Sequence, residues 1–149
     1  MTVYRFVRPI YRNDISGDGA RKKGGRWNSP GFPVVYTSTS ISLSLLELLI
    51  YNSSYEVIRV NMLMQITVPE NLMKSLSVNA LKQTWQKDID YSRFIGNEFL
   101  KNKKSLLLKV PSAIIPEESN VLINPAHPDF KRVKIIKAAL FQYDTRLFK

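Results

Sequence analysis

Hydrophobic and polar residues alternate along several short stretches of the chain, a pattern typical of β-strands with one buried face. The longest such stretch, 55–68, places Met62, Met64, Ile66 and Val68 on one side, and a proline ends it. The sequence therefore predicts a protein rich in β-strands. Shorter strands are predicted at residues 3–7, 34–37, 105–110 and 121–124, with one or two closing strands within 133–143.

Two stretches have the character of helices. Ile41–Tyr51 consists of apolar residues and serines apart from one acid. Ser38 or Ser40 is a suitable N-cap for it, because a serine hydroxyl accepts a hydrogen bond from a free N–H of the first turn. A second helix is predicted over 91–102, capped by Asp90. Its inward-facing residues are expected to be Phe94, Ile95, Phe99 and Leu100.

The segments between these elements and the order of strands and helices together indicate the fold class. Residues 11–28 are rich in Gly, Asp, Asn, Arg and Lys, which predicts a long structured loop, and 71–87 indicate no regular element. Strands and helices do not alternate as they do in parallel α/β folds. We therefore expect an α+β fold with a mostly antiparallel, split sheet flanked by short helices, in a single domain over 1–149.

Composition narrows the class of protein. The 149 residues, 44% of them hydrophobic, are enough for one domain with a substantial core. The absence of cysteine excludes disulfides, thiolate nucleophiles and cysteine-bound metals. No signal peptide or membrane span is apparent, so we expect a cytoplasmic protein without membrane attachment.

The net charge of +10, from 22 lysines and arginines against 12 acids, attracts anions: nucleic acid, an acidic protein or a phosphorylated small molecule. Most of the lysines are dispersed, which is typical of a solvated surface. A tighter group borders a Gly-Gly turn. It consists of Arg21, Lys22, Lys23 and Arg26.

Familiar ligand motifs are incomplete. Gly17 and Gly19 begin like a dinucleotide fingerprint, but Lys22 occupies the third glycine position and no strand–turn–helix surrounds it. The single histidine, His127, cannot form a metal cluster, so no metal site is predicted. His127 has prolines on both sides, and there we expect a hydrogen-bonded turn residue rather than a catalytic base.

Glu47 is the most informative residue. It is the only charged residue within 34–54, and an acid in an apolar helix is costly unless it is paired or used. The other candidates are Arg26 on the Gly-Gly turn, Tyr36 at a strand end, and Ser112. Each has a structural alternative: a salt bridge for Arg26 or Glu47, a core position for Tyr36, and a turn cap for Ser112.

Together these residue types fit one ligand. Arginine binds a diphosphate through two parallel charge-assisted hydrogen bonds, and tyrosine stacks on a cationic ring. A carboxylate stabilises the sugar cation that forms as a leaving group departs. A ligand with all three parts is NAD+. The candidate residues from this argument are therefore Arg26, Tyr36 and Glu47, with Ser112 as the fourth member of the group.

Five motifs occur in order along essentially the whole chain. They are Gly24-Gly-Arg-Trp-Asn, Val35-Tyr-Thr-Ser, Glu47 in its leucine-rich helix, Val110-Pro-Ser-Ala, and Asn-Val-Leu-Ile-Asn-Pro-Ala-His-Pro-Asp-Phe at 120–130. In these motifs the chain resembles the RES-domain proteins, which are toxins of bacterial RES–Xre toxin–antitoxin pairs. Ser42 and Ser44 stand where small residues such as alanine are expected, away from the candidate site.

The resemblance implies a fold like that of the ADP-ribosyltransferases and an activity that destroys NAD+. NAD+ would then be the substrate, with no bound cofactor. Cleavage of the nicotinamide–ribose bond would use phosphate as co-substrate, giving ADP-ribose-1″-phosphate, or water. The family's arginine, tyrosine, glutamate and serine correspond to Arg26, Tyr36, Glu47 and Ser112, which are the candidate catalytic residues. Trp27 and Asn120 lie in the family's motifs, and together with Arg26 and Tyr36 they are the candidate substrate-binding residues. The implied partner is an Xre-like antitoxin that covers the active site, and a homodimer of the toxin is one arrangement for that complex.

Two other functions remain open at the level of sequence. The same fold and site could transfer ADP-ribose to a protein target. A non-enzymatic basic module for nucleic acid is the third alternative, and it predicts salt-sensitive retention that does not depend on Glu47. We expect no direct nucleic-acid binding, because the candidate site contains an acid that repels phosphate.

Overall fold

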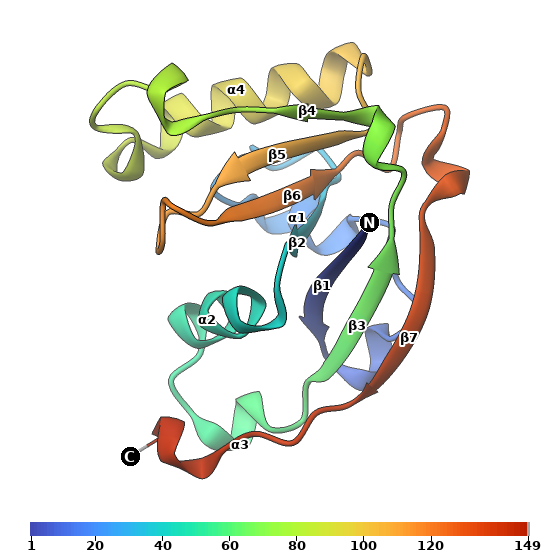
Figure 1. The fold of residues 1–149 in the computed structure, drawn as a ribbon, viewed down its shortest axis with the longest axis vertical. Coiled ribbons are helices and arrows are strands. Elements are labelled where there is room, and N and C mark those ends of the chain that lie inside the picture. The colour runs from blue at the N-terminus through green and yellow to red at the C-terminus, as the bar shows by residue number, and fades with distance from the viewer. Residues whose placement is uncertain (149) are drawn as a thin grey trace.

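The computed structural model describes residues 1–148, in which seven strands form one sheet (Figure 1). The strand order is β4-β5-β6-β2-β1-β3-β7, and every neighbouring pair is antiparallel except β4–β5. The expected α+β fold with a mostly antiparallel sheet is confirmed. The strands are β1 (Thr2–Val7), β2 (Val35–Ser38), β3 (Met62–Thr67), β4 (Met73–Ser75), β5 (Leu107–Pro111), β6 (Ser119–Ile123) and β7 (Lys134–Leu140).

The sheet is split where β2 meets β1. The single residue pair Tyr4–Ser38 joins these two strands, whereas β1 and β3 are paired over the full length of both. The two halves, β4-β5-β6-β2 and β1-β3-β7, therefore run in different directions in Figure 1. Val35 from one half and Met64 from the other belong to the same hydrophobic core, so the split sheet encloses apolar residues from both halves.

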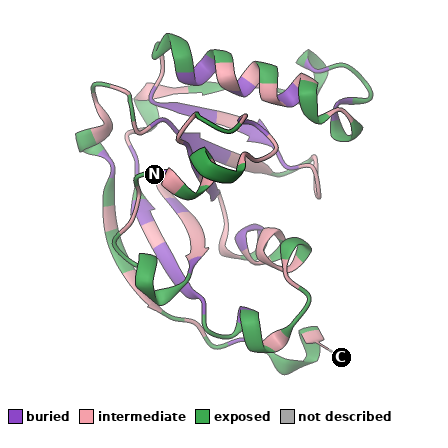
Figure 2. Ribbon diagram, turned by 180° about the vertical axis from the view of Figure 1, so that it is seen from behind, coloured by how far each residue is buried: buried purple, intermediate pink, exposed green. Residues whose placement is uncertain are grey.

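A second core lies on the other face of β5 and β6. Successive side chains of a strand point to opposite faces, so Leu107 belongs to the first core and Leu108 to the second. Phe99 and Leu100 of helix α4 (Ile89–Asn102) pack into this second core together with Trp27. Figure 2 shows the inner strands mostly buried, whereas the edge strands β4 and β7 and the outer sides of the helices are largely exposed.

The other α-helices of the described residues are α1 (Asp18–Lys23), α2 (Ile41–Tyr51) and α3 (Tyr55–Ile58). Helix α2 has the predicted bounds, and Ser40 rather than Ser38 is its N-cap, because Oγ of Ser40 accepts a hydrogen bond from N of Leu43 at 3.1 Å. Within residues 1–148, none of the helices has both the length and the apolar content that a membrane crossing requires.

The prediction of one strand over 55–68 is wrong in its first part. This part forms α3, and β3 starts only at Met62. Both neighbouring strands end opposite Met62, where Val7 of β1 and Leu140 of β7 pair with it. The residues before Met62 therefore have no strand to pair with. Asn61 closes the helical segment instead, since its Nδ2 donates to the carbonyl group of Val57 at 3.0 Å.

The predicted loop over 11–28 contains α1. Asp18 in the first turn of this helix forms salt bridges with Arg21 and Lys22, one turn further along. Ion pairs at these spacings support short helices. The glycines and charged residues that indicated a loop thus include a helical turn directly before the Gly-Gly turn.

Helix α4 differs from its prediction at its start and on one side. It begins at Ile89, and its N-cap is Asp88 rather than Asp90, because Oδ1 of Asp88 accepts from N of Tyr91 at 3.1 Å. Phe94 is 66% exposed instead of facing inwards, so the buried side of α4 is narrower than expected.

Candidate active site

Glu47 lies on α2 and is half-buried. Its Oε1 accepts hydrogen bonds from Nδ2 of Asn120 at 2.7 Å and from Oγ of Ser112 at 3.1 Å. Within residues 1–148 no lysine or arginine forms a salt bridge with Glu47. Pairing with a cation therefore does not explain this acid in an apolar helix, and its charge is available to a ligand.

Ser112 follows β5 and is fully buried. Its Oγ accepts hydrogen bonds from the N–H groups of Ile114 at 3.1 Å and Ile115 at 3.2 Å. Because these two donors occupy its lone pairs, its single proton points to Glu47. Ser112 thus caps a turn and contacts Glu47 at the same time. The role of a turn cap, expected as the structural alternative, is therefore compatible with a role at the candidate site.

Asn120 lies in β6, directly opposite Ser38 of β2. Its Oδ1 accepts a hydrogen bond from Oγ of Ser38 at 2.7 Å, while its Nδ2 donates to Glu47. The sequence predicts that Asn120 binds the substrate, but in the structure both ends of its amide contact protein side chains. Asn120 is therefore a neighbour of the candidate carboxylate.

Helix α4 holds the backbone of the Gly-Gly turn in place. Oγ of Ser92 donates to the carbonyl oxygen of Arg26 at 2.5 Å, and Nε of Arg93 donates to the carbonyl oxygen of Gly25 at 2.8 Å. The position of Arg26 thus depends on a helix more than 60 residues further along the chain.

Trp27 is packed inside the molecule. It is 2% exposed, and its ring centroid lies 5.9 Å from that of Trp85. A Cβ atom on Gly96 of α4 would be 1.6 Å from the carbonyl oxygen of Trp27, so only glycine allows helix and loop to approach this closely. The indole is buried in the core and offers a ligand almost no surface, and substrate binding by Trp27 stays a prediction.

Tyr36 lies in β2 on the same face as Ser38. Its hydroxyl donates to Oδ1 of Asn28 at 2.6 Å and accepts from the N–H group of Trp27 at 3.0 Å. Burial raises the pKa of Tyr36 well above its ordinary value, so the phenol is neutral at physiological pH. The hydroxyl is engaged with protein groups, which leaves the ring as the part of Tyr36 that can contact a ligand.

Two contacts connect Arg26 to the turn that contains Ser112. Nη1 of Arg26 donates to the carbonyl oxygen of Gln86 at 3.2 Å, and Nε2 of Gln86 donates to the carbonyl oxygen of Ala113 at 3.0 Å. In the described part of the chain Arg26 forms no salt bridge. Arg26 and Glu47 therefore border the same turn, one through Gln86 and the other through Ser112.

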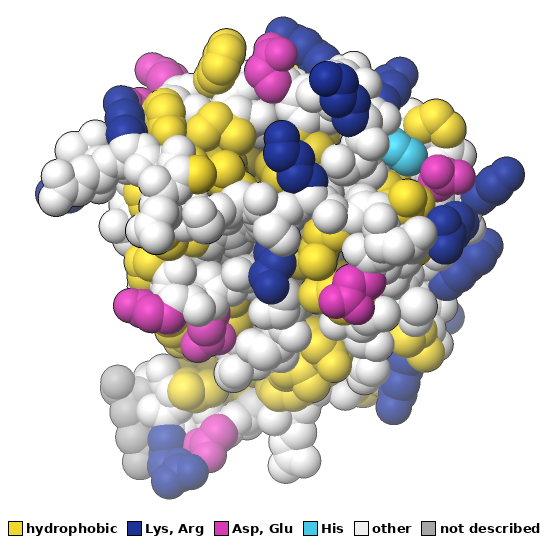
Figure 3. Space-filling model, turned by 45° about the horizontal axis from the view of Figure 1, so that its top comes forward, with side chains coloured by type: hydrophobic (Ala, Val, Ile, Leu, Met, Phe, Trp, Pro, Cys, Tyr) yellow, Lys and Arg dark blue, Asp and Glu magenta, His cyan; other side chains and the backbone are white. Residues whose placement is uncertain are grey.

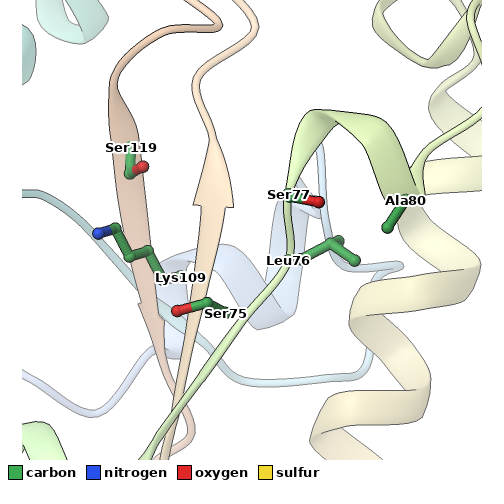
Figure 4. A pocket seen from close by; sticks show the side chains of 6 residues that line it. All are labelled: Ser75, Leu76, Ser77, Ala80, Lys109 and Ser119. Atoms are coloured by element: carbon green, nitrogen blue, oxygen red, sulfur yellow. The ribbon is translucent and has the colours of Figure 1, made fainter.

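Two surface cavities lie apart from these residues. One of about 330 Å³ is next to the edge strand β4, where Ser75, Lys109 and Ser119 contribute to its lining (Figure 4). The other, of about 530 Å³, includes Arg8 and Lys23. Neither is lined by Arg26, Tyr36, Glu47 or Ser112, so the candidate site is defined by its side chains.

The surface charge agrees with the interpretation of dispersed cations. Lys and Arg side chains are spread over the face shown in Figure 3, with Asp and Glu side chains between them. His127 also has the expected role, because its Nδ1 accepts a hydrogen bond from N of Asp129 at 3.0 Å within a turn.

Three residues that contact the candidate site carry little signal in the sequence. Gln86 lies in the segment for which no element is predicted, and Arg93 lies on a helix expected only to pack against the core. Ser38 belongs to a hydroxyl-rich stretch whose only predicted role is helix capping. Their contacts span 60 to 82 positions in the chain, beyond the reach of any local pattern.

A split antiparallel sheet that carries an acid and an arginine around one turn is thus the frame of the candidate site. A family model of the RES domain matches residues 2–145, and the chain belongs to the RES-domain family. It is 38% identical to Toxin Res of Photorhabdus laumondii, over 100% of this chain and 98% of that protein. It is 37% identical to the Prs ADP-ribosylating toxin of a Sphingobium species, over 96% of this chain and 92% of that protein.

A third similarity concerns the NAD(+) phosphorylase MbcT of Mycobacterium tuberculosis. A stretch of 47 residues is 43% identical to MbcT and covers 31% of this chain and 25% of that protein. The fold matches a chain in the crystal structure of the M. tuberculosis MbcT–MbcA toxin–antitoxin complex with a TM-score of 0.75, over 99% of this chain and 86% of that chain. At 19% identity, this structural match shows a shared fold alone.

Proposed function

We propose that this chain is a toxin that consumes NAD+ by cleaving the bond between nicotinamide and ribose. The observation that carries the proposal is the setting of Glu47, a half-buried carboxylate held by Ser112 and Asn120 without a cationic partner among the described residues. Such a group stabilises a positive charge that develops on a ligand. The sugar cation that forms as nicotinamide leaves carries this charge.

Arg26 and Tyr36 bind two other parts of the substrate. The guanidinium of Arg26 binds the diphosphate, which is supported by its lack of a salt bridge within residues 1–148. The ring of Tyr36 stacks on the cationic nicotinamide. The three basic residues of α1, Arg21, Lys22 and Lys23, outnumber its one acid, Asp18, which pairs with the first two, so the helix adds a net positive charge directly before the Gly-Gly turn.

Phosphate is the proposed acceptor. Nicotinamide leaves with the electron pair of the broken C–N bond, and a phosphate oxygen forms the new bond to C1″ of the ribose. The products are nicotinamide and ADP-ribose-1″-phosphate; water in the same position gives ADP-ribose. The short similarity to the NAD(+) phosphorylase MbcT and the shared fold support this choice.

The second candidate is transfer of ADP-ribose to a protein. The observation that favours this alternative is the similarity to the Prs ADP-ribosylating toxin over nearly the full length of the chain. Both reactions break the same bond and need the same carboxylate, so they differ only in the acceptor.

One NMR experiment separates these reactions. Purified protein is incubated with NAD+ in the presence and absence of phosphate. We expect free nicotinamide in the proton spectrum and, with phosphate, a new phosphomonoester signal in the phosphorus spectrum. Intact NAD+ under both conditions contradicts the proposal. A third sample also contains a protein extract, and ADP-ribose attached to its proteins, without the phosphomonoester, decides for the second candidate.

We also propose that an Xre-like antitoxin covers this site, in the cytoplasm where NAD+ is available. Helix α2 carries Glu47 and is apolar almost throughout, yet Ile50 is 62% and Tyr51 75% exposed. A helix that is apolar on all sides is normally buried, so a partner on α2 accounts for these residues. The net charge of +10 favours an acidic partner over a second copy of the chain.

A further inference from the structure

A series of side-chain hydrogen bonds extends from Glu47 to a residue without an assigned role, Ser38. Oγ of Ser38 donates to Oδ1 of Asn120, and Nδ2 of Asn120 donates to Oε1 of Glu47, both at 2.7 Å. Ser38 is buried, and it is paired with Asn120 in the ladder between β2 and β6. The series is therefore built into the sheet.

The direction of each hydrogen bond follows from the chemistry of Glu47. An ionised carboxylate only accepts hydrogen bonds, so the NH2 end of the Asn120 amide must face it. The carbonyl end of the amide then faces Ser38, whose hydroxyl is the donor. Rotating the amide by half a turn would place two acceptors against each other at Glu47. Ser38 thus stabilises the one orientation of Asn120 that serves the carboxylate.

Only one oxygen of Glu47 is used in this arrangement. Asn120 and Ser112 both donate to Oε1, while Oε2 accepts no hydrogen bond from residues 1–148. Donors from the end of β5 and from β6 therefore restrict the rotation of the carboxylate and leave its second oxygen for a ligand.

We propose that Ser38 and Asn120 are positioning residues that orient Glu47 so that Oε2 faces the ribose of NAD+. The proposal rests on the function proposed above. In this role neither residue contacts the substrate, and both act through Glu47. A misdirected carboxylate stabilises the sugar cation less well but leaves the diphosphate and nicotinamide contacts intact. Loss of either residue therefore lowers kcat and leaves KM almost unchanged.

The test compares steady-state NAD+ cleavage by Ser38→Ala, Asn120→Ala and the control Thr37→Val. Thr37 is buried in the same strand, and its hydroxyl also bonds to β6, at the Val121 carbonyl oxygen (2.7 Å), but on the opposite face. We expect kcat to fall about 10–100-fold in the first two variants and to stay at the parent value in the control. Ser38→Thr, which keeps the hydroxyl, is expected to retain most of the kcat of the parent protein.

Other results overturn the proposal. A raised KM at unchanged kcat in Asn120→Ala would make Asn120 a substrate-binding residue. An equal loss of kcat in Thr37→Val would indicate a general packing effect. Ser38→Ala is also expected to have no further effect in a Glu47→Gln background, because residues that act through one group are not additive. An undiminished effect in that background would place Ser38 outside the series.

A second measurement does not depend on activity. The side-chain amide signals of Asn120 in a ¹⁵N NMR spectrum, identified by their loss in Asn120→Ala, are expected to shift in Ser38→Ala and to stay in place in Thr37→Val. Unshifted signals in Ser38→Ala overturn the series itself. If the parent protein leaves NAD+ intact, the proposed function fails, and these signals alone decide whether Ser38 orients Asn120.

Discussion

Glu47 and Asn120 are 73 positions apart in the chain, and Nδ2 of Asn120 lies 2.7 Å from Oε1 of Glu47. This contact joins α2 to β6, and Ser112 reaches the same oxygen from the end of β5. The β5–β6 hairpin thus locates the carboxylate, although the helix that carries it packs against β1 and β2. Changes in the hairpin are therefore expected to alter the chemistry of Glu47.

Replacing Glu47 with glutamine tests the central role of its charge. The amide has the same shape, and its carbonyl oxygen can still accept from Asn120 and Ser112, so folding is expected to be unaffected. Nicotinamide release from NAD+ is expected to fall by about 10²–10³-fold, because the sugar cation loses its counter-charge. Glu56→Gln, an exposed acid on α3, is the control. Turnover at the parent rate in Glu47→Gln would refute the assignment.

Arg26→Lys tests the diphosphate contact. Lysine keeps the charge but cannot form two parallel hydrogen bonds, so KM for NAD+ is expected to rise about tenfold or more. Initial rates over a range of NAD+ concentrations measure this change. Arg59→Lys serves as the control, because Arg59 pairs with Glu56 on the surface. An unchanged KM in Arg26→Lys would mean that another group binds the diphosphate.

The close contact between Gly96 and Trp27 predicts a large difference between two Gly→Ala substitutions. In Gly96→Ala the new methyl group meets the Trp27 backbone, which is expected to destabilise the protein by about 1–3 kcal/mol and to displace the loop of Arg26. Gly19 of α1 has open space around its Cα, so Gly19→Ala is expected to be neutral or slightly stabilising. Thermal unfolding compares them, and equal melting temperatures would contradict the packing argument.

Stability is expected to depend on pH above 10 through Tyr143. Its hydroxyl donates to the Asn61 carbonyl oxygen at 2.8 Å, and burial raises the pKa of Tyr143 from 10.0 to about 12. Between these values the unfolded chain loses the proton while the folded chain keeps it. The protonated hydroxyl of Tyr143 therefore makes its full contribution to the unfolding free energy below pH 10, and this contribution is lost as the pH rises to about 12.

Tyr143→Phe isolates that effect. The variant is expected to be less stable at pH 9, because it lacks the hydrogen bond, but its stability should fall less steeply between pH 10 and 12. Burial of Tyr36 acts in the same direction, so part of the decline is expected to remain. Denaturant unfolding at several pH values measures the slope, with the exposed Tyr11→Phe as control. Parallel slopes for the parent and Tyr143→Phe would show that Tyr143 does not contribute.

Ile50→Glu tests the proposed antitoxin surface on α2. A charged side chain at this exposed position is expected to weaken antitoxin binding and to restore toxicity during coexpression, while NAD+ cleavage by the isolated protein stays unchanged. Ile136→Glu on β7, at a residue that is 57% exposed, is the control for a new surface charge. Equal neutralisation of parent and Ile50→Glu would place the antitoxin elsewhere.

Much of the fold follows from local patterns. The bounds of α2 and the positions of β1, β5 and β6 agree with the predicted segments to within about two residues, because apolar periodicity and capping act over one or two turns. The three-residue strand β4 lies in a segment without such a pattern, and it exists because it pairs with β5. The start of β3 differs from the local pattern for a related reason, because its two partner strands end opposite Met62.

The candidate site also has one part that local sequence patterns reveal and another that only packing reveals. Arg26, Tyr36, Glu47 and Ser112 could be singled out from residue type and neighbours alone, since an acid in an apolar helix and an arginine on a glycine turn are visible in one dimension. The burial of the Trp27 indole could not, because it results from packing against Trp85 and α4. The hydrogen bond from Ser38 to Asn120 could not be predicted either.

The sequence by itself determined which elements form, which charges are unusual and which ligand chemistry those residue types suit. Only the tertiary structure decided which oxygen of Glu47 is held, which side chains hold it, and that α4 positions the loop of Arg26. The physical reason is range. Propensity and periodicity act between residues a few positions apart, whereas a hydrogen bond of 2.7 Å between residues 73 positions apart exists only after the two halves of the sheet and α2 have packed together.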